Sequence, residues 1–180
     1  RLSIIDLTEH ANQPFKMDGF DYTMVYNGEV YNYIEIKDEL INLGYKFDST
    51  SDTEVVYYSL VEWGTDAVNK FNGMFAIAFV DNSSGKITLI RDRIGIKPLY
   101  YTVVDRQLVF ASEIISILQF PLNNLRIKKT ALAQTIIYNT PLKTNTIFEN
   151  IFQLERGSIL TYQDENIDIS KYWEFPSYSP

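Results

Sequence analysis

The chain has 180 residues, 46% apolar and 14% aromatic, which is enough to bury one substantial core. A net charge of −7 argues against partners that need a basic surface, such as nucleic acid or anionic membranes, and no apolar run approaches the roughly 20 residues of a membrane-spanning helix. Without cysteine, disulfides and thiolate metal sites are excluded, which fits the cytoplasm, and a single histidine, His10, leaves almost no scope for a Ser-His-Asp triad.

Short runs of β-branched and aromatic residues predict strands along the chain. They cover residues 2–7, 22–26, 74–80, 87–90, 99–104, 108–111 and 158–162. The run 74–80 is almost wholly apolar, which is typical of a strand covered on both faces. Turn residues at 81–85 and 104–107 predict hairpins between neighbouring strands.

Apolar residues at helical spacing predict helices at 34–43, 53–63, 113–118 and 130–138, with a short one between Thr65 and Gly73. Asn32 with Glu35, and Ser51 with Glu54, have capping-box spacing at the first two helices, and Ser112 is a candidate cap before residue 113. Because hairpins dominate the strands and helices cluster before and after them, the pattern favours an α+β layered fold.

Asn27-Gly28-Glu29 lies between the strand 22–26 and the helix 34–43, and reads as a binding loop. An Asn-Gly pair is also a strong signal of a tight hairpin turn. On the pair alone, the turn is favoured by roughly two to one. The wider set of motifs reverses this preference.

Four groups of residues stand out by their order and spacing. They are Arg1-Leu2-Ser3-Ile4-Ile5, Asn27-Gly28-Glu29, Ser51-Asp52-Thr53-Glu54 and Arg91-Asp92-Arg93-Ile94-Gly95-Ile96-Lys97-Pro98-Leu99-Tyr100. Together with Gly73-Met74-Phe75-Ala76 and Phe110-Ala111-Ser112-Glu113, they resemble the glutaminase domain of class II glutamine amidotransferases, specifically that of glutamine-hydrolysing asparagine synthetase. The resemblance covers residues 1–173, and residues 174–180 have the composition of a linker to a further domain. It implies an N-terminal-nucleophile hydrolase fold, a four-layer α/β/β/α sandwich with antiparallel sheets.

The resemblance also implies a mechanism. In the family an N-terminal cysteine, with its own α-amino group as base, attacks the side-chain amide of L-glutamine and releases ammonia through a thioester. Asn27 (side-chain amide) and Gly28 (backbone N–H) match the oxyanion hole, where one donor is worth about 3 kcal/mol of the barrier. No metal and no cofactor belong to this domain.

The same resemblance also assigns the residues that bind the charged groups of the substrate. Arg1 matches the partner of the α-carboxylate, and the backbone of Leu2, Ser3, Ile4 and Ile5 is expected to line the same pocket. Asp52 matches the group that takes the α-ammonium, with Glu29 a nearby contact. Each of these residues has a plainer alternative. Arg1 could be an exposed terminal arginine, and Glu29 a solvated acid of the loop. Asp52 could be a carboxylate that is favoured by the dipole at the start of a helix.

The segment Arg91–Tyr100 is diagnostic of the family without an evident chemical role. Gly95 and Pro98 specify a shaped loop, and Asp92 is expected to pair with Arg91, Arg93 or Lys97. We interpret the segment as scaffold, and an arginine cluster for phosphate is the weaker alternative.

The sequence departs from the family in one respect that matters. No cysteine is present, so we expect a domain truncated at its N-terminus, with its first strand or strands missing, that does not hydrolyse glutamine by itself. ATP and Mg²⁺ are expected in the synthetase domain of the parent protein, which would receive ammonia through a channel, and a homodimer of the parent is a further expectation. The alternatives are a non-catalytic glutaminase-like scaffold, as in β-lactam synthetases, or an amidotransferase with another acceptor.

Overall fold

A computed structural model describes residues 13–122, 125–139 and 144–176. The strands are β1 (Tyr22–Val30), β2 (Gly73–Asp81), β3 (Ile87–Arg91), β4 (Tyr100–Val104), β5 (Gln107–Ala111), β6 (Phe152–Gln153), β7 (Ser158–Gln163) and β8 (Asn166–Lys171). The helices are α1 (Tyr33–Asn42), α2 (Asp52–Trp63), α3 (Ile114–Ile117) and α4 (Lys129–Tyr138), with a 3₁₀ helix, η2 (Gly64–Asn69). The predicted strand 2–7 lies outside the described residues.

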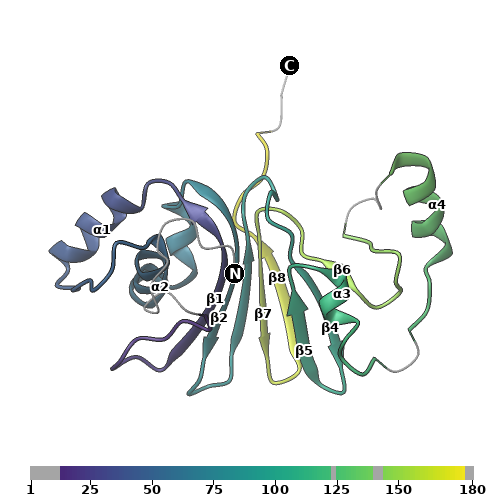
Figure 1. The fold of residues 1–180 in the computed structure, drawn as a ribbon, viewed down its shortest axis with the longest axis horizontal. Helices are drawn as coiled ribbons and strands as arrows, with labels where there is room; N and C mark the ends of the chain where they lie inside the picture. Colours follow the sequence, from purple (N-terminus) through teal and green to yellow (C-terminus); the bar gives the residue numbers. More distant parts are fainter. Residues whose placement is uncertain (1–12, 123–124, 140–143, 177–180) are drawn as a thin grey trace.

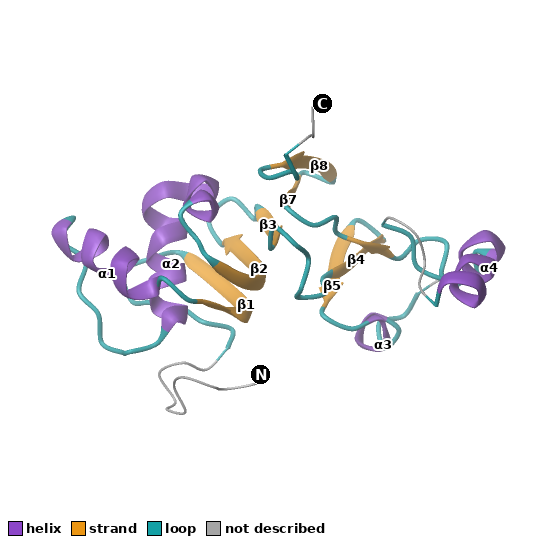
Figure 2. Cartoon of the chain, turned by 90° about the horizontal axis from the view of Figure 1, so that it is seen from above, coloured by secondary structure: helices purple, strands orange, loops and turns teal. Residues whose placement is uncertain are grey.

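The strands form two antiparallel sheets. One sheet has the order β1-β2-β3-β7-β8 and the other the order β5-β4-β6. Figure 1 shows α1 and α2 beside β1 and β2, and the second sheet on the other side of the five-stranded one. In Figure 2 the helices α3 and α4 lie beyond the second sheet, which completes the order α/β/β/α. The predicted α+β sandwich is confirmed.

Each face of β2 belongs to a different core. Phe75, Ile77 and Phe79 pack into the core under α1 and α2, whereas Ala76 and Ala78 belong to the core between the two sheets. Because side chains alternate along a strand, an apolar run buried on both sides is the expected result. The prediction for residues 74–80 is therefore confirmed.

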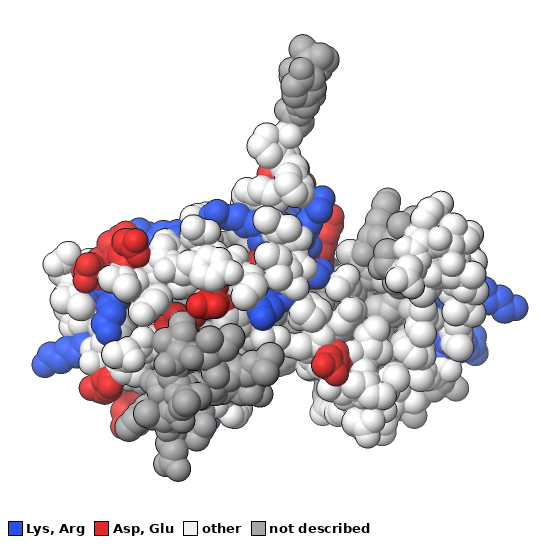
Figure 3. Space-filling view, turned by 45° about the horizontal axis from the view of Figure 1, so that its top comes forward, with Lys and Arg blue, Asp and Glu red and all other residues white. Residues whose placement is uncertain are grey.

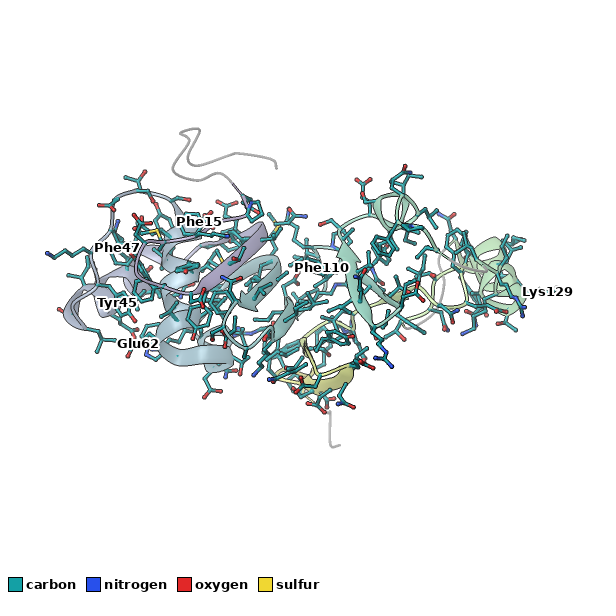
Figure 4. The ribbon with its side chains drawn as sticks, turned by 90° about the horizontal axis from the view of Figure 1, so that it is seen from below. Phe15, Tyr45, Phe47, Glu62, Phe110 and Lys129 are labelled. Atoms are coloured by element: carbon teal, nitrogen blue, oxygen red, sulfur yellow. The ribbon has the colours of Figure 1, made fainter. Side chains whose placement is uncertain are left out.

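Aromatic rings fill much of the helical side of the five-stranded sheet. The rings of Tyr45 and Phe47 lie 4.8 Å and 5.3 Å from that of Tyr58, and the Tyr45 hydroxyl donates to Glu62 at 2.8 Å. Figure 4 places Tyr45, Phe47 and Glu62 at this end of the molecule, far from Phe110 on the second sheet. These rings are thus packing groups around α2.

Two of the predicted helix caps are wrong. Asn32 makes no capping bond at α1, because its side chain accepts from the Asn72 N–H at 2.8 Å and donates to the Lys70 carbonyl at 3.0 Å. Ser112 does not cap α3, whose N-cap residue is Glu113. In both places a contact with a distant segment takes the polar group that local sequence assigned to the helix.

At α2 the capping prediction holds in part. Ser51 accepts from the Thr53 N–H at 3.2 Å, as an N-cap does. Glu54 does not complete the capping box, since it accepts from the N–H groups of Asp48 and Ser49 in the preceding loop.

The surface face in Figure 3 mixes both signs of charge over α1, α2 and the five-stranded sheet, whereas the part around α3 and α4 is mostly uncharged. This face has no continuous basic area of the kind that nucleic acid needs. Within the described residues, no helix has the length and apolar character needed to cross a membrane.

Candidate functional site

Asn27, Gly28 and Glu29 lie within a strand. All three belong to β1 and pair with Ala76, Phe75 and Met74 of β2. The predicted loop and its hairpin-turn alternative are both wrong as conformations, because residues far along the chain supply the pairing strand; the binding role of these residues stays a prediction. The three residues nevertheless stay adjacent to one another at the end of β1 nearest to α1.

The outer edge of β1, which faces away from β2, is covered by three different kinds of acceptor. The Met24 N–H donates to the backbone carbonyl of Phe15 at 2.9 Å. The Tyr26 N–H donates to the side-chain amide oxygen of Gln13 at 2.8 Å, and the same amide donates back to the Tyr26 carbonyl at 2.6 Å. The Val30 N–H donates to the carboxylate of Asp52 at 3.0 Å.

The backbone N–H of Gly28 also lies on this outer edge, and no described residue covers it. Backbone N–H groups alternate sides along a strand, so Gly28 points its N–H the same way as Tyr26 and Val30. Among the described residues, none accepts a hydrogen bond from it. A Cβ at this position would lie 2.2 Å from the Met74 carbonyl oxygen and 2.6 Å from the Phe75 Cα, so only glycine fits.

The side chain of Asn27 lies on the face of the five-stranded sheet that is turned toward the second sheet. Its Nδ2 donates to the Ser112 hydroxyl at 3.0 Å. A primary amide carries two N–H donors, and no other described residue accepts from Asn27, so the second donor can serve a ligand. The amide of Asn27 and the N–H of Gly28 therefore offer two neutral donors from adjacent residues.

Asp52 is the first residue of α2 and is only 4% exposed. Its Oδ2 accepts from the Tyr26 hydroxyl at 2.7 Å and from the Val30 N–H at 3.0 Å. Burial raises the pKa of Asp52, and these hydrogen bonds offset part of the rise. Burial and the neighbouring carboxylate together raise the pKa of Tyr26 far above its usual value, so the phenol stays a donor.

Asp52 begins a helix, as its plainer interpretation predicts, and it also accepts hydrogen bonds from β1; its role toward the α-ammonium stays a prediction. Glu29 precedes Val30 on β1 and is half-buried, and its charge adds to the rise in the Tyr26 pKa. The structure brings Asn27, Gly28, Glu29 and Asp52 to one end of β1. Arg1, Leu2, Ser3, Ile4 and Ile5 lie outside the described residues.

The segment Arg91–Tyr100 is held by buried charges that bind backbone. Asp92 forms no ion pair with Arg91, Arg93 or Lys97, contrary to the prediction, although all three lie within the described residues. Its two carboxylate oxygens accept from a set of backbone N–H groups, those of Phe75, Ile94, Gly95, Ile96 and Lys97. The Arg91 guanidinium donates to the carbonyls of Gly95, Lys97 and Leu154. With its donors used in this way, Arg91 is a scaffold residue, which disfavours the phosphate alternative.

Three residues of the site were missed by sequence reasoning: Gln13, Tyr26 and Ser112. Ser112 belongs to a motif of the resemblance but was assigned to a helix cap, and Tyr26 was assigned to a strand. Gln13 carried no signal. Among the described residues, no group of three or more His, Cys, Asp or Glu residues is placed to hold a metal ion.

Comparison with known proteins identifies relatives that match most of the chain. Residues 1–173 match the family of the glutamine amidotransferase domain. The chain is 36% identical over 180 residues to asparagine synthetase (glutamine-hydrolyzing) 3 of Bacillus subtilis, covering 98% of this chain and 29% of that protein. It is 34% identical over 198 residues to a putative asparagine synthetase (glutamine-hydrolyzing) 2 of Methanocaldococcus jannaschii, covering 100% of this chain and 38% of that protein. The chain thus spans well under half the length of these curated relatives.

Solved structures share the fold. Glutamine phosphoribosylpyrophosphate amidotransferase of B. subtilis superposes with a TM-score of 0.62 at 19% identity, over 91% of this chain and 32% of that chain. A glutamine aminotransferase class-II domain protein from Silicibacter pomeroyi gives a TM-score of 0.53 at 17% identity, over 92% of this chain and 72% of that chain. The family match and the shared architecture agree: the chain belongs to the glutamine amidotransferase domain family.

Proposed function

We propose that this domain binds L-glutamine at the outer edge of β1 and hydrolyses it to glutamate and ammonia when an N-terminal cysteine is supplied. The N–H of Gly28, from which no described residue accepts a hydrogen bond, lies beside the amide of Asn27 and the buried carboxylate of Asp52 and is the observation that carries this proposal. Neutral donors next to a carboxylate suit a ligand that has a polar carbonyl at one end and an ammonium at the other.

Each end of glutamine has a group of matching charge in the proposal. Gly28 and the second N–H of Asn27 stabilise the negative oxygen that develops on the attacked amide. Asp52 takes the α-ammonium, with Glu29 as a second acidic contact. Arg1 takes the α-carboxylate through a bidentate pair, and the backbone of Leu2, Ser3, Ile4 and Ile5 lines this part of the pocket.

No residue of the 180 can act as the thiolate nucleophile, because the sequence has no cysteine. The chain by itself is therefore expected to bind glutamine without hydrolysing it. The relatives are named asparagine synthetases, and we propose that the parent protein is one as well and is cytoplasmic. A C-terminal domain would use ATP, Mg²⁺ and channelled ammonia to amidate aspartate, and the parent would form a homodimer. A non-catalytic scaffold, or a different acceptor for the ammonia, is the competing proposal.

Calorimetric titration of the 180-residue chain tests the binding step. L-Glutamine should bind at least about tenfold more tightly than D-glutamine or glutaramate, which lacks the α-ammonium that Asp52 would take. Equal affinity for all three ligands, or no binding of L-glutamine, refutes the proposed site.

The complete reading frame tests the hydrolytic step. Expression from its own start codon should give a protein whose mature first residue is cysteine and which releases glutamate and ammonia from glutamine in equal amounts. Any other first residue in a protein that still binds glutamine favours the scaffold.

A further inference from the structure

One hydrogen bond joins the candidate oxyanion donor to the second sheet. The Asn27 Nδ2 on β1 donates to the Ser112 hydroxyl at 3.0 Å, and Ser112 follows directly after the last residue of β5. The two residues are 85 positions apart, so the contact exists only because the two sheets pack face to face.

The Ser112 hydroxyl does not cap the helix that follows it, so helix capping does not explain its position. A serine directly before a short helix is expected to cap it, but the N-cap residue of α3 is Glu113 and no side chain makes a capping bond there. Ser112 is half-buried, and its oxygen is directed to Asn27. The bond therefore needs an explanation in terms of Asn27.

Asn27 needs an anchor if its amide is to serve as an oxyanion donor. The last torsion of an asparagine side chain is broad and roughly two-fold, so a free amide also presents its carbonyl oxygen to the site. That orientation would repel a developing oxyanion, and donors help most when they are fixed before the reaction. A hydroxyl that accepts one Nδ2 proton holds the amide nitrogen in place and leaves the second proton for the ligand.

We infer that Ser112 is a positioning residue that fixes the Asn27 amide as an oxyanion donor, an inference that rests on the proposed glutaminase function. It acts through Asn27 and does not itself contact the reacting atoms. Since Ser112 directly follows β5 of the second sheet, the geometry of the oxyanion donors depends on the packing between the sheets as well as on β1.

Three variants test the assignment: Ser112→Ala removes the hydroxyl, Ser112→Thr retains it, and Ser116→Ala makes the same change on the exposed part of α3. In the 180-residue chain, Ser112→Ala should shift the side-chain amide resonances of Asn27 in a ¹⁵N–¹H spectrum. Ser112→Thr should restore them, and Ser116→Ala should leave them in place. An unchanged Asn27 side-chain resonance in Ser112→Ala overturns the assignment.

Kinetics of the complete protein provide the second readout. Removal of one oxyanion donor lowers kcat by about 10²–10³-fold, so loss of its anchor should lower kcat by roughly tenfold with KM within about twofold. A kcat equal to that of the unsubstituted protein, or a rise in KM that matches the fall in kcat, overturns the assignment. Absence of glutaminase activity in the unsubstituted protein refutes the proposed function instead, and with it the catalytic role of Ser112, whatever the spectra show.

Discussion

Replacing Asp52 by asparagine should separate the stability of the domain from its affinity for glutamine. The carboxylate is 4% exposed and its Oδ2 accepts from Tyr26 and from Val30. An asparagine amide oxygen can accept from the same two donors, so the fold keeps these bonds and loses only the charge. The α-ammonium of glutamine, in contrast, would lose its ionic partner.

The loss of binding follows from the value of a charged hydrogen bond. Such bonds contribute about 1.5–3 kcal/mol, which corresponds to a rise of roughly 10- to 150-fold in the Kd for L-glutamine. Affinity for glutaramate, which has no ammonium, should change much less. The comparison of the two ligands therefore isolates the charge contact from any general disturbance of the site.

The effect on stability depends on pH, and its sign follows from the raised pKa of Asp52. Because burial raises the pKa of this carboxyl above its ordinary value, the folded state binds the proton more tightly than the unfolded state. The free energy of unfolding then falls as pH rises from that value through the raised pKa, by at most about 1.4 kcal/mol per pH unit. At pH values above the raised pKa, the unsubstituted protein is destabilised by the buried charge of Asp52. Asp52→Asn removes this charge and the destabilisation that it causes.

Calorimetry at pH 8 and urea unfolding between pH 4 and pH 8 measure the two quantities. Relative to the unsubstituted chain, Asp52→Asn should gain stability as the pH rises, while its Kd for L-glutamine increases. The reasoning fails if the difference in unfolding free energy does not vary with pH. It also fails if the two chains bind L-glutamine within twofold of each other.

The remaining predictions concern the strand pair behind the site. Gly28→Ala and Gly73→Ala would each drive a Cβ to within 2.2 Å of a carbonyl oxygen on the facing strand, and each should cost about 3 kcal/mol in urea unfolding. Gly85→Ala has open space and a φ of +71°, so it should cost only about 1 kcal/mol and serves as the control. The double variant of Gly28 and Gly73 should cost less than the sum, because one separation of β1 from β2 relieves both clashes; strict additivity would contradict this account. Asp92→Asn puts an N–H donor among backbone N–H groups and should cost about 3 kcal/mol, and a cost below about 1 kcal/mol would show that the carboxylate is not what holds this loop.

Elements whose signals are local were predictable from the sequence. The hairpin at residues 104–107 depends on two adjacent residues, and Asp105 and Arg106 adopt the positive φ angles of 47° and 65° that a tight turn between β4 and β5 requires. The helix cap at Ser51 likewise depends on a residue two positions away. Both were visible because everything that decides them lies within a few residues.

Features decided by distant partners were not predictable in the same way. Asn27-Gly28 has the composition of a turn, yet it continues a strand because β2 supplies hydrogen-bonding partners for it. Asn32 and Ser112 have the composition of helix caps, yet each bonds to a segment far along the chain. The short strand β6 has only two residues, too few for any periodicity to reveal.

The candidate site residues were named only through the resemblance to a family. Periodicity and composition offered a hairpin turn for Asn27-Gly28 and a helix start for Asp52. That no described residue accepts from the Gly28 N–H could not have been derived from the sequence, since it depends on which neighbours cover the rest of the outer edge of β1. Side chains of Gln13 and Asp52 do so on either side of it.

The segment Arg91–Tyr100 and the candidate site behave as one structural unit, which explains why a segment without chemistry is so distinctive. Asp92 accepts from the N–H of Phe75 at 3.3 Å, and Phe75 is the residue that pairs with Gly28 across the strands. The position of Gly28 in the sheet depends on the same backbone that Asp92 holds. A carboxylate that gathers several backbone N–H groups fixes that backbone more firmly than a surface ion pair would, because charged hydrogen bonds in a buried place are worth more. The oxyanion donors proposed here would therefore be positioned from both sides, by Asp92 through β2 and by Ser112 through the second sheet.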